Sequence, residues 1–166
     1  MDYNSKKFKN IVLFLAYNAG LDVGKKKLAK LLYFIDFTLY ELRKKSLTGM
    51  KYTKMDYGPM PEPNVFYPAL DKLVNEGFIK IGKSEKPGLD KLEKIVPHGQ
   101  PDMSVFDEDE KGIIEQVTAQ YKLENGGSLE RIAQSEPPYK MVKYGERVPL
   151  HLAFYRNSFG EMDLDD

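Results

Sequence analysis

The chain of 166 residues contains no cysteine, which excludes disulfides, thiolate metal ligands and a cysteine nucleophile. This absence fits a reducing compartment, and we expect a cytoplasmic protein. The only histidines, His98 and His151, lie in separate segments without the spacing of a zinc motif. We therefore expect no metal site and no other cofactor.

Long apolar runs are also missing. No stretch reaches the roughly 18 apolar residues of a membrane span. The short apolar run Ile11–Ala16 follows three lysines, but Tyr17 and Asn18 interrupt it and no small-residue cleavage site follows. We expect neither a membrane segment nor a signal peptide.

Catalytic and phosphate-binding motifs are absent as well. The chain has no G-x-S-x-G nucleophile elbow and no G-x-x-x-x-G-K-[ST] phosphate loop. Gly24 followed by Lys25, Lys26 and Lys27 shares residue types with a phosphate loop, but the spacing differs, and we interpret the lysines as solvated residues entering a helix. The sequence favours a protein that is not an enzyme.

The net charge is zero, but its distribution is uneven. Residues 1–54 carry 12 Lys or Arg against 4 Asp or Glu, a net charge of +8, and residues 55–166 carry the opposite excess. A basic half can contact phosphate or an acidic protein. The favoured interpretation is that the two halves fold together and neutralise each other, since zero net charge is unusual for a nucleic-acid binder.

Composition predicts one folded domain. The hydrophobic fraction of 42% and the aromatic fraction of 12% supply enough core material for a chain of this length. We expect a compact α+β domain over residues 1–160, mostly helical with small antiparallel β-hairpins, and an acidic tail over 161–166.

Two helices are predicted in the first third. The spacing of Phe8, Ile11, Val12 and Leu15 predicts a helix over 5–18, and a leucine-rich stripe predicts a longer one over 25–44. The longer helix carries a second stripe of Tyr33, Phe37 and Tyr40. Such a helix is either buried on both faces or contacts a partner with one of them.

The following segment changes character. Leu47-Thr48-Gly49 predicts a turn, and residues 50–57 predict a short strand. Pro59 and Pro61 lack the backbone donor that a central strand needs, so we expect residues 57–61 to form an ordered loop.

Residues 63–96 predict the outline of a winged helix. A helix beginning at Pro63, or near Tyr67 if Pro68 does not kink it, would end at Gly77. A hairpin of 78–81 and 92–96 would follow, with Pro87-Gly88 at its tip. The helix offers Asn64, Lys72 and Asn75 but no arginine, the most frequent base reader. The outline therefore favours the fold more than it favours DNA binding.

The last third predicts short elements. Asp107 and Glu110 form a capping-box pattern at the start of a helix that Asn125-Gly126-Gly127 would end. Ser128 would cap a short helix, residues 139–144 would form another, and residues 148–155 would be strand-like.

Several motifs together resemble a known family. The run Lys27-Leu28-Ala29-Lys30-Leu31-Leu32-Tyr33-Phe34-Ile35-Asp36-Phe37, followed by Leu47-Thr48-Gly49, Tyr52 and Tyr57-Gly58-Pro59, resembles the Panacea domain. This is the SocA-like antitoxin family, which is also found in phage-associated proteins. Glu136-Pro137-Pro138-Tyr139 is similar to a second family segment, with Tyr139 where tryptophan is common and Gln134 near where histidine is common. The resemblance covers about residues 5–155.

The resemblance implies that the chain neutralises a cognate toxin, encoded nearby, by direct protein binding. Members of the family stand beside toxins of many unrelated types, so the family does not identify the partner. The second aromatic stripe and the proline-stiffened loop suggest where the partner binds. The hypothetical partner-binding residues are Tyr33, Asp36, Phe37, Tyr40, Tyr57, Gly58, Pro59, Glu136 and Tyr139.

The alternatives remain open at this point. Asp36 could instead cap or bond backbone inside the fold, and Tyr57 could belong to the core. The protein could be a winged-helix regulator that binds nucleic acid, with Lys72 and Lys83 touching DNA, or an adaptor that delivers a partner to a protease. The sequence leaves homodimerisation open.

Overall fold

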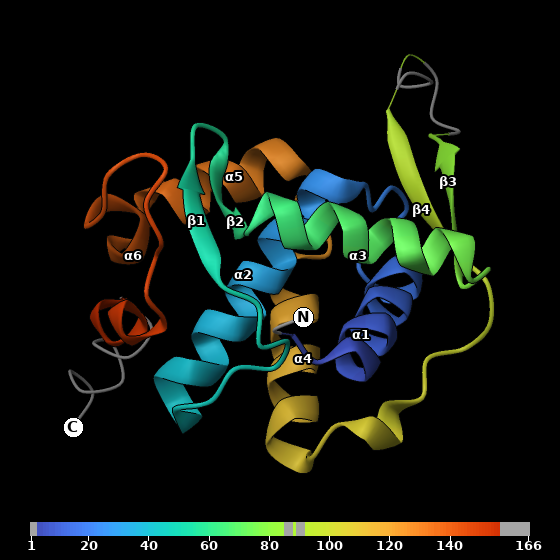
Figure 1. Ribbon diagram of the computed structural model, residues 1–166, viewed down its shortest axis with the longest axis horizontal. Helices are drawn as coiled ribbons and strands as arrows, with labels where there is room; N and C mark the ends of the chain where they lie inside the picture. The colour runs from blue at the N-terminus through green and yellow to red at the C-terminus, as the bar shows by residue number, and fades with distance from the viewer. Residues whose placement is uncertain (1–2, 85–87, 89–91, 157–166) are drawn as a thin grey trace.

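A computed structural model describes residues 3–84, 88 and 92–156, and helix α2 (Lys25–Arg43) crosses the centre of this part of the chain (Figure 1). Helix α4 (Glu108–Tyr121), helix α5 (Gly126–Ser135) and the 3-10 helix η2 (Leu150–Tyr155) all pack against it. Most of its residues are buried, including the polar Lys30 and Asp36. Both stripes of α2 therefore face the interior over most of their length, as in the first of the two interpretations, but Tyr40 and Leu42 near its C-terminal end are only partly buried.

Helix α1 (Ser5–Asn18) has the predicted bounds. The side chain of Asn4 accepts a hydrogen bond from the Lys7 backbone N–H and so caps its first turn. The helix packs against the short 3-10 helix η1 (Met103–Val105) and strand β4 (Glu93–Pro97), and its apolar face joins the common core.

Residues 58–61 form a strand and Tyr57 lies in the turn before it, so the predicted loop over 57–61 is wrong. Strands β1 (Tyr52–Met55) and β2 (Gly58–Pro61) pair antiparallel, with Lys54 opposite Pro59 and Tyr52 opposite Pro61. The backbone of Tyr52 and Lys54 bonds outward, to residues 145–148, rather than to β2. Because these positions need no donor from β2, the two prolines fit an edge strand of this hairpin.

The helix and hairpin of the middle region follow the predicted order. Helix α3 (Pro63–Asn75) begins at Pro63 with Pro68 inside it, so it does not start near Tyr67. Gly77 adopts a φ of 81°, and the N–H groups of Gly77 and Phe78 bond back to Val74 and Leu73. This Schellman arrangement ends the helix. Strands β3 (Ile79–Lys83) and β4 then pair antiparallel. Most of the predicted tip, Pro87 included, lies outside the described residues.

The last third differs from the predictions in four places. The first is that α4 ends at Tyr121, and Gly126 and Gly127 lie inside α5 instead of ending α4. The capping box of Asp107 and Glu110 is confirmed at the start of α4. Asn125, rather than Ser128, caps α5, because its side chain accepts from the Ser128 N–H. Helix α6 spans Pro137–Lys140, earlier than predicted, and residues 150–155 form a 3-10 helix instead of a strand.

The extended part of the C-terminal region lies a few residues before the predicted strand. The Val148 N–H donates to the Tyr52 carbonyl, the Lys54 N–H donates to the Glu146 carbonyl, and Arg147 forms a bridge with Thr53. Pro149 follows, and the chain continues into η2 at Leu150. Residues 145–148 thus extend the β1–β2 hairpin on its other edge.

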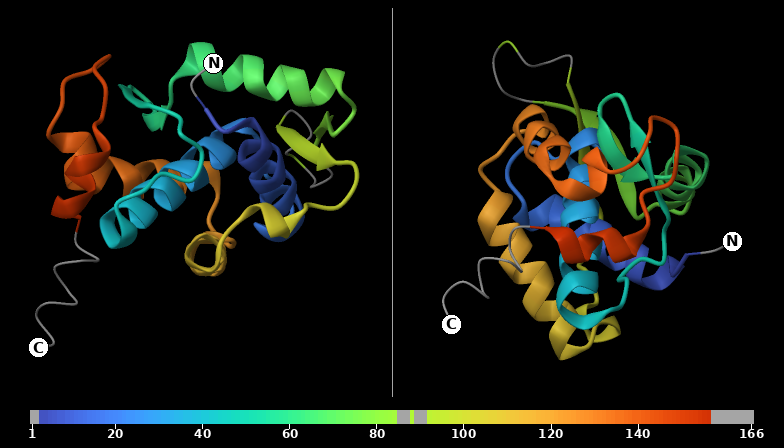
Figure 2. Two further views of the ribbon diagram at one scale, coloured as in Figure 1. Left: turned by 60° about the horizontal axis from the view of Figure 1, so that its bottom comes forward. Right: turned by 90° about the vertical axis from the view of Figure 1, so that its left-hand side faces the viewer.

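The predicted compact, mostly helical α+β fold is confirmed. The buried apolar residues, from Phe8 to Ala153, form one core, and Figure 2 shows the helices gathered around α2 with the two hairpins at the surface. Across the described ranges, no helix is both long and apolar enough to cross a membrane. The predicted acidic tail, 161–166, lies outside the described residues.

Candidate functional site

Asp36, on the buried face of α2, holds the loop that leads to β1. Its carboxylate accepts hydrogen bonds from the backbone N–H groups of Leu47 and Thr48, at 2.6 and 3.1 Å. It also accepts from the hydroxyls of Ser46, Thr48 and Tyr52, the last at 2.5 Å. Asp36 is fully buried. The structure therefore agrees with the alternative in which Asp36 forms hydrogen bonds with the backbone inside the fold.

Tyr33 and Phe37 lie beside this cluster in the core. Both are fully buried, their ring centroids are 4.5 Å apart, and both rings contact Tyr52. Burial, followed by the nearby charge of Glu136, raises the pKa of the Tyr33 hydroxyl well above its ordinary value. These two predicted residues expose no side-chain surface in this conformation, so any effect on a partner would be indirect.

Glu136 belongs to a second buried network, centred on Arg156. The Arg156 guanidinium donates to both Glu136 oxygens, at 2.9 and 3.2 Å, and to the Thr38 hydroxyl at 2.8 Å. The Tyr33 hydroxyl donates to the same Glu136 carboxylate at 2.8 Å. Arg156 also pairs with Glu41, which is buried. This network attaches the C-terminal segment and the start of α6 to α2.

Tyr139 is buried beneath the surface of α6. Its hydroxyl donates to the Met55 carbonyl at 2.9 Å, and its ring and that of Tyr144 flank the Lys54 ammonium at 4.2 and 4.8 Å. Burial, and then its hydroxyl interaction with Tyr144, raises the pKa of Tyr139 to about 12. Nearby, the Gln134 side chain donates to the Asp56 carbonyl. Together these contacts attach α5 and α6 to the β1–β2 hairpin.

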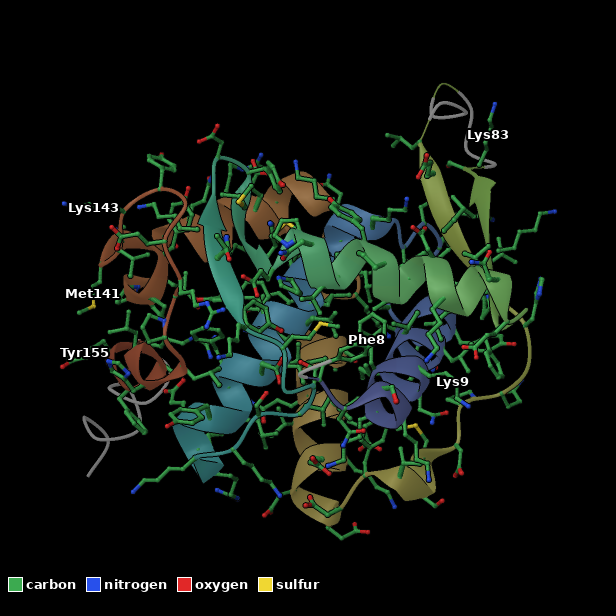
Figure 3. The ribbon with its side chains drawn as sticks, viewed as in Figure 1. Phe8, Lys9, Lys83, Met141, Lys143 and Tyr155 are labelled. Carbon is green, nitrogen blue, oxygen red and sulfur yellow. The ribbon has the colours of Figure 1, made fainter. Side chains whose placement is uncertain are left out.

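Tyr40 reaches the surface and contacts Phe154, one of several exposed apolar side chains in the C-terminal region. Its ring lies 5.6 Å from that of Phe154. Phe154, Tyr155, Met141 and Tyr144 are 39%, 59%, 52% and 65% exposed. Figure 3 shows Met141 and Tyr155 on the same side of the molecule, which the right-hand view of Figure 2 faces. We call Tyr40, Met141, Tyr144, Phe154 and Tyr155 the C-terminal aromatic face.

Tyr57 lies elsewhere, at the turn of the β1–β2 hairpin, and is 38% exposed, so it is not a core residue. Beneath it, the Lys30 ammonium lies 5.4 Å from the Tyr57 ring and donates to the Pro59 carbonyl at 3.2 Å. Gly58 has a φ of 108°, and a Cβ there would meet Lys30 atoms at 2.9 and 3.0 Å. Lys30 thus connects the two parts of the family motif, the α2 run and the Tyr57-Gly58-Pro59 segment.

Lys30 also lines a pocket between α2, β2 and α3. Burial lowers the pKa of its ammonium to about 8, although Glu130 acts in the opposite direction. The other walls come from Lys25, Lys26, Ala29, Tyr57, Met60 and Tyr67. We call this cavity the Tyr57 pocket.

The structure therefore divides the predicted residues into two surface regions joined by a buried scaffold. Tyr40 and Tyr57 reach the surface at different places, whereas Asp36, Glu136 and the remaining predicted residues support the fold between them. Sequence reasoning missed Phe154, Tyr155 and Arg156, because the predicted strand over 148–155 gave no reason to set them apart. The sequence feature that could have identified these residues is a pair of adjacent aromatic residues followed directly by an arginine.

Metal chemistry receives no support from the described residues, where no three His, Cys, Asp or Glu side chains group together as ligands. His98 and His151 are both exposed and far apart in the chain.

Comparison with known proteins gives one result at the level of the family. No curated protein and no solved structure matches the chain significantly. The family model for the antitoxin SocA-like Panacea domain matches residues 28–140, more than half of the chain. That range begins in the first turn of α2 and ends with α6, so it contains the Asp36 cluster, Lys30 and the Tyr-Gly-Pro strand. The chain belongs to the SocA-like antitoxin family, as a Panacea-domain protein.

Proposed function

We propose that this protein is an antitoxin that neutralises a toxin encoded nearby by binding it directly, without catalysis. The family supports an antitoxin role, and the C-terminal aromatic face is the observation that supports direct binding. Protein interfaces are enriched in tyrosine, phenylalanine and methionine, and a few aromatic anchors carry most of the binding energy. The face supplies such residues in one place, from the end of α2 to η2.

The backing of this face is rigid. Arg156 follows Tyr155 directly and is fixed by Glu136, Thr38 and Glu41. Tyr139 and Lys54 hold the base of Tyr144 in the same way. A surface that is already ordered loses little conformational entropy when it binds, and this raises affinity.

The predicted residues take different roles in this proposal. Tyr40 contacts the partner at the edge of the face. Tyr33, Asp36, Phe37, Glu136 and Tyr139 position the face from inside the fold. Tyr57, Gly58 and Pro59 form a separate region near the start of α2.

Co-expression with the neighbouring gene product tests the proposal. The wild-type chain should restore growth to cells that express the neighbour, and the two proteins should co-purify. Tyr155→Ala and Tyr144→Ala should each weaken co-purification by about tenfold or more, as for interface anchors. Leu123→Ala is the control, because Leu123 is 93% exposed but lies in the turn just after α4, outside the face.

Each alternative gives a different result. Full rescue and complex formation by both tyrosine variants would show that the partner binds another surface. Rescue accompanied by depletion of the neighbour would indicate an adaptor for a protease. A concentration-dependent increase in mass of the isolated chain, lost in the tyrosine variants, would assign the face to a homodimer instead.

A further inference from the structure

The Tyr57 pocket is built from residues that the proposed antitoxin interface does not use. Its volume is about 370 Å³, within the range of small-molecule sites. Lys25, Lys26 and Lys30 enter it from α2, and Tyr57 and Tyr67 enter it from the hairpin and α3. Ala29 and Met60 supply apolar wall between them.

The start of α2 has an unusual charge pattern. Its first three residues are lysines, its first turn has no acidic residue, and the Gly24 cap offers no side chain to the first N–H groups. A helix N-terminus is electropositive and normally attracts acidic residues or a polar cap. Placing cations there costs stability, and an anion bound nearby would offset that cost.

Lys30 strengthens the case because it lines the pocket although it is fully buried. The Pro59 carbonyl accepts one hydrogen bond from its ammonium, which has three donors. Burial of an ammonium is unfavourable, as its lowered pKa of about 8 records. An anion in the pocket would stabilise the charged form.

Two carboxylates already face the lysines. Lys26 pairs with Glu130 at 2.9 Å and Lys25 pairs with Glu93 at 3.8 Å. The Lys25 pair is long and partly exposed, and such pairs contribute little. Three lysines against two carboxylates, beside the positive end of α2, leave the pocket electropositive.

The tyrosines determine the second part of the ligand. Tyr57 and Tyr67 are each 38% exposed, and Lys25 lies 5.9 Å from the Tyr67 ring. Partly exposed aromatic rings beside lysines can stack with the bases of nucleotides while the cations contact phosphate. The chemistry that fits is therefore a phosphate attached to a flat ring.

We propose that the Tyr57 pocket binds a small aromatic phosphate of the nucleoside monophosphate class, with the phosphate at Lys25 and the start of α2, above the buried ammonium of Lys30, and the ring against Tyr57 and Tyr67. Calorimetric titration of the isolated full chain with AMP, adenosine and inorganic phosphate tests this without any toxin. AMP should saturate the protein below about 10 mM and bind at least about tenfold more tightly than either fragment. Binding should weaken from pH 7 to pH 9.5, as Lys30 loses its proton.

Variants of the pocket residues test whether AMP binds in the Tyr57 pocket. Lys25→Gln and Tyr67→Leu should each weaken AMP binding by about five- to tenfold, the usual effect of losing one charged or stacking contact. Lys111→Gln is the matched control, since Lys25 and Lys111 have the same side-chain exposure of 34% and each forms one long ion pair. Lys30→Met tests the buried cation with a side chain of similar length.

Three outcomes would overturn the proposal: adenosine binding as tightly as AMP, no saturation with any probe, or unchanged AMP affinity in both lysine variants. If the lysine variants lose the toxin complex but no probe binds, the pocket receives an acidic side chain of the partner instead. Because AMP binding is measured without toxin, a failure here leaves the antitoxin proposal standing, and the reverse also holds.

Discussion

At the scale of single residues, Gly58 illustrates how a motif position can be dictated by space and backbone conformation together. Its φ of 108° is unfavourable for residues with a Cβ, and the end of the buried Lys30 side chain lies 2.9 Å from the position that a Cβ would take. The glycine of the Tyr-Gly-Pro motif is thus explained by the lysine of the α2 motif.

Gly58→Ala should lower the free energy of unfolding by about 2–4 kcal/mol, from the backbone strain plus the contact with Lys30. Gly99→Ala is the control, because Gly99 has a φ of 87° but no atom lies within 4 Å of the position that a Cβ would occupy. The control should lose only about 1–2 kcal/mol. Equal losses in urea unfolding would show that the Lys30 contact is relieved without cost.

Asp36→Ala should cost about 3 kcal/mol or more, since it leaves buried donors of the 46–52 loop without an acceptor. Thermal and urea unfolding would measure this. Asp71→Ala, on the exposed side of α3, should change stability by less than about 0.5 kcal/mol. A small effect at Asp36 would mean that water replaces the carboxylate.

Lys30 should make stability depend on pH. Between about pH 8 and pH 10 the unfolded chain keeps this lysine charged while the folded chain does not, so the unfolded state binds more protons. Stability of the wild type should therefore rise relative to Lys30→Met, by about 2 kcal/mol over this range. Urea unfolding at pH 7.5, 9 and 10 checks the sign, and a flat difference would contradict the lowered pKa of Lys30.

At the scale of elements, residue spacing and cap residues predicted the helices better than they predicted the β1–β2 hairpin. The bounds of α1 and the capping box of α4 followed from spacing and cap chemistry alone. The β2 strand did not, because whether Pro59 and Pro61 fit depends on which edge of β1 bonds residues 145–148. Likewise, no local pattern in residues 148–155 indicates that the extended pairing with β1 stops before Pro149 and that η2 begins directly after it.

Asp107→Ala should destabilise the protein by about 1–2 kcal/mol, because it removes the N-terminal cap of α4 and half of the capping box. Glu115→Ala, exposed in the middle of the same helix, should have little effect. Circular dichroism melting of both variants would test this difference. Equal melting temperatures would show that neighbouring groups replace the cap.

At the scale of the whole molecule, the uneven charge distribution resolves into contacts between the two halves. Five cations of the basic half each pair with a carboxylate of the acidic half: Lys7, Lys25, Lys26, Arg43 and Lys45. This confirms that the halves neutralise each other. Composition predicted that the charges of the two halves would cancel, but only the fold shows which residues form the ion pairs.

The candidate site was predicted less well. Its motif residues proved largely internal, because aromatic spacing alone does not distinguish a helix buried on both faces from one with an exposed face.

Arg156→Met should lower stability by about 3–5 kcal/mol, because it removes the cation that pairs with the buried Glu41 and the largely buried Glu136. It should also weaken toxin binding, since Tyr155 and Phe154 lose their anchor. Arg147→Met is the control, as its ion pair with Glu62 is exposed and long. Adding Glu41→Gln to Arg156→Met should recover part of the stability. No recovery would show that the loss comes from packing alone.

The attachment of residues 145–148 to β1 also bears on where this domain can be cut. A chain ended at residue 140, where the family match stops, would keep the whole motif yet leave the outer edge of β1 bare. An uncovered strand edge is a template for pairing with another chain. Such a shortened protein should therefore precipitate or form strand-linked assemblies, and we expect the autonomous folding unit to extend beyond the stretch by which the family is recognised.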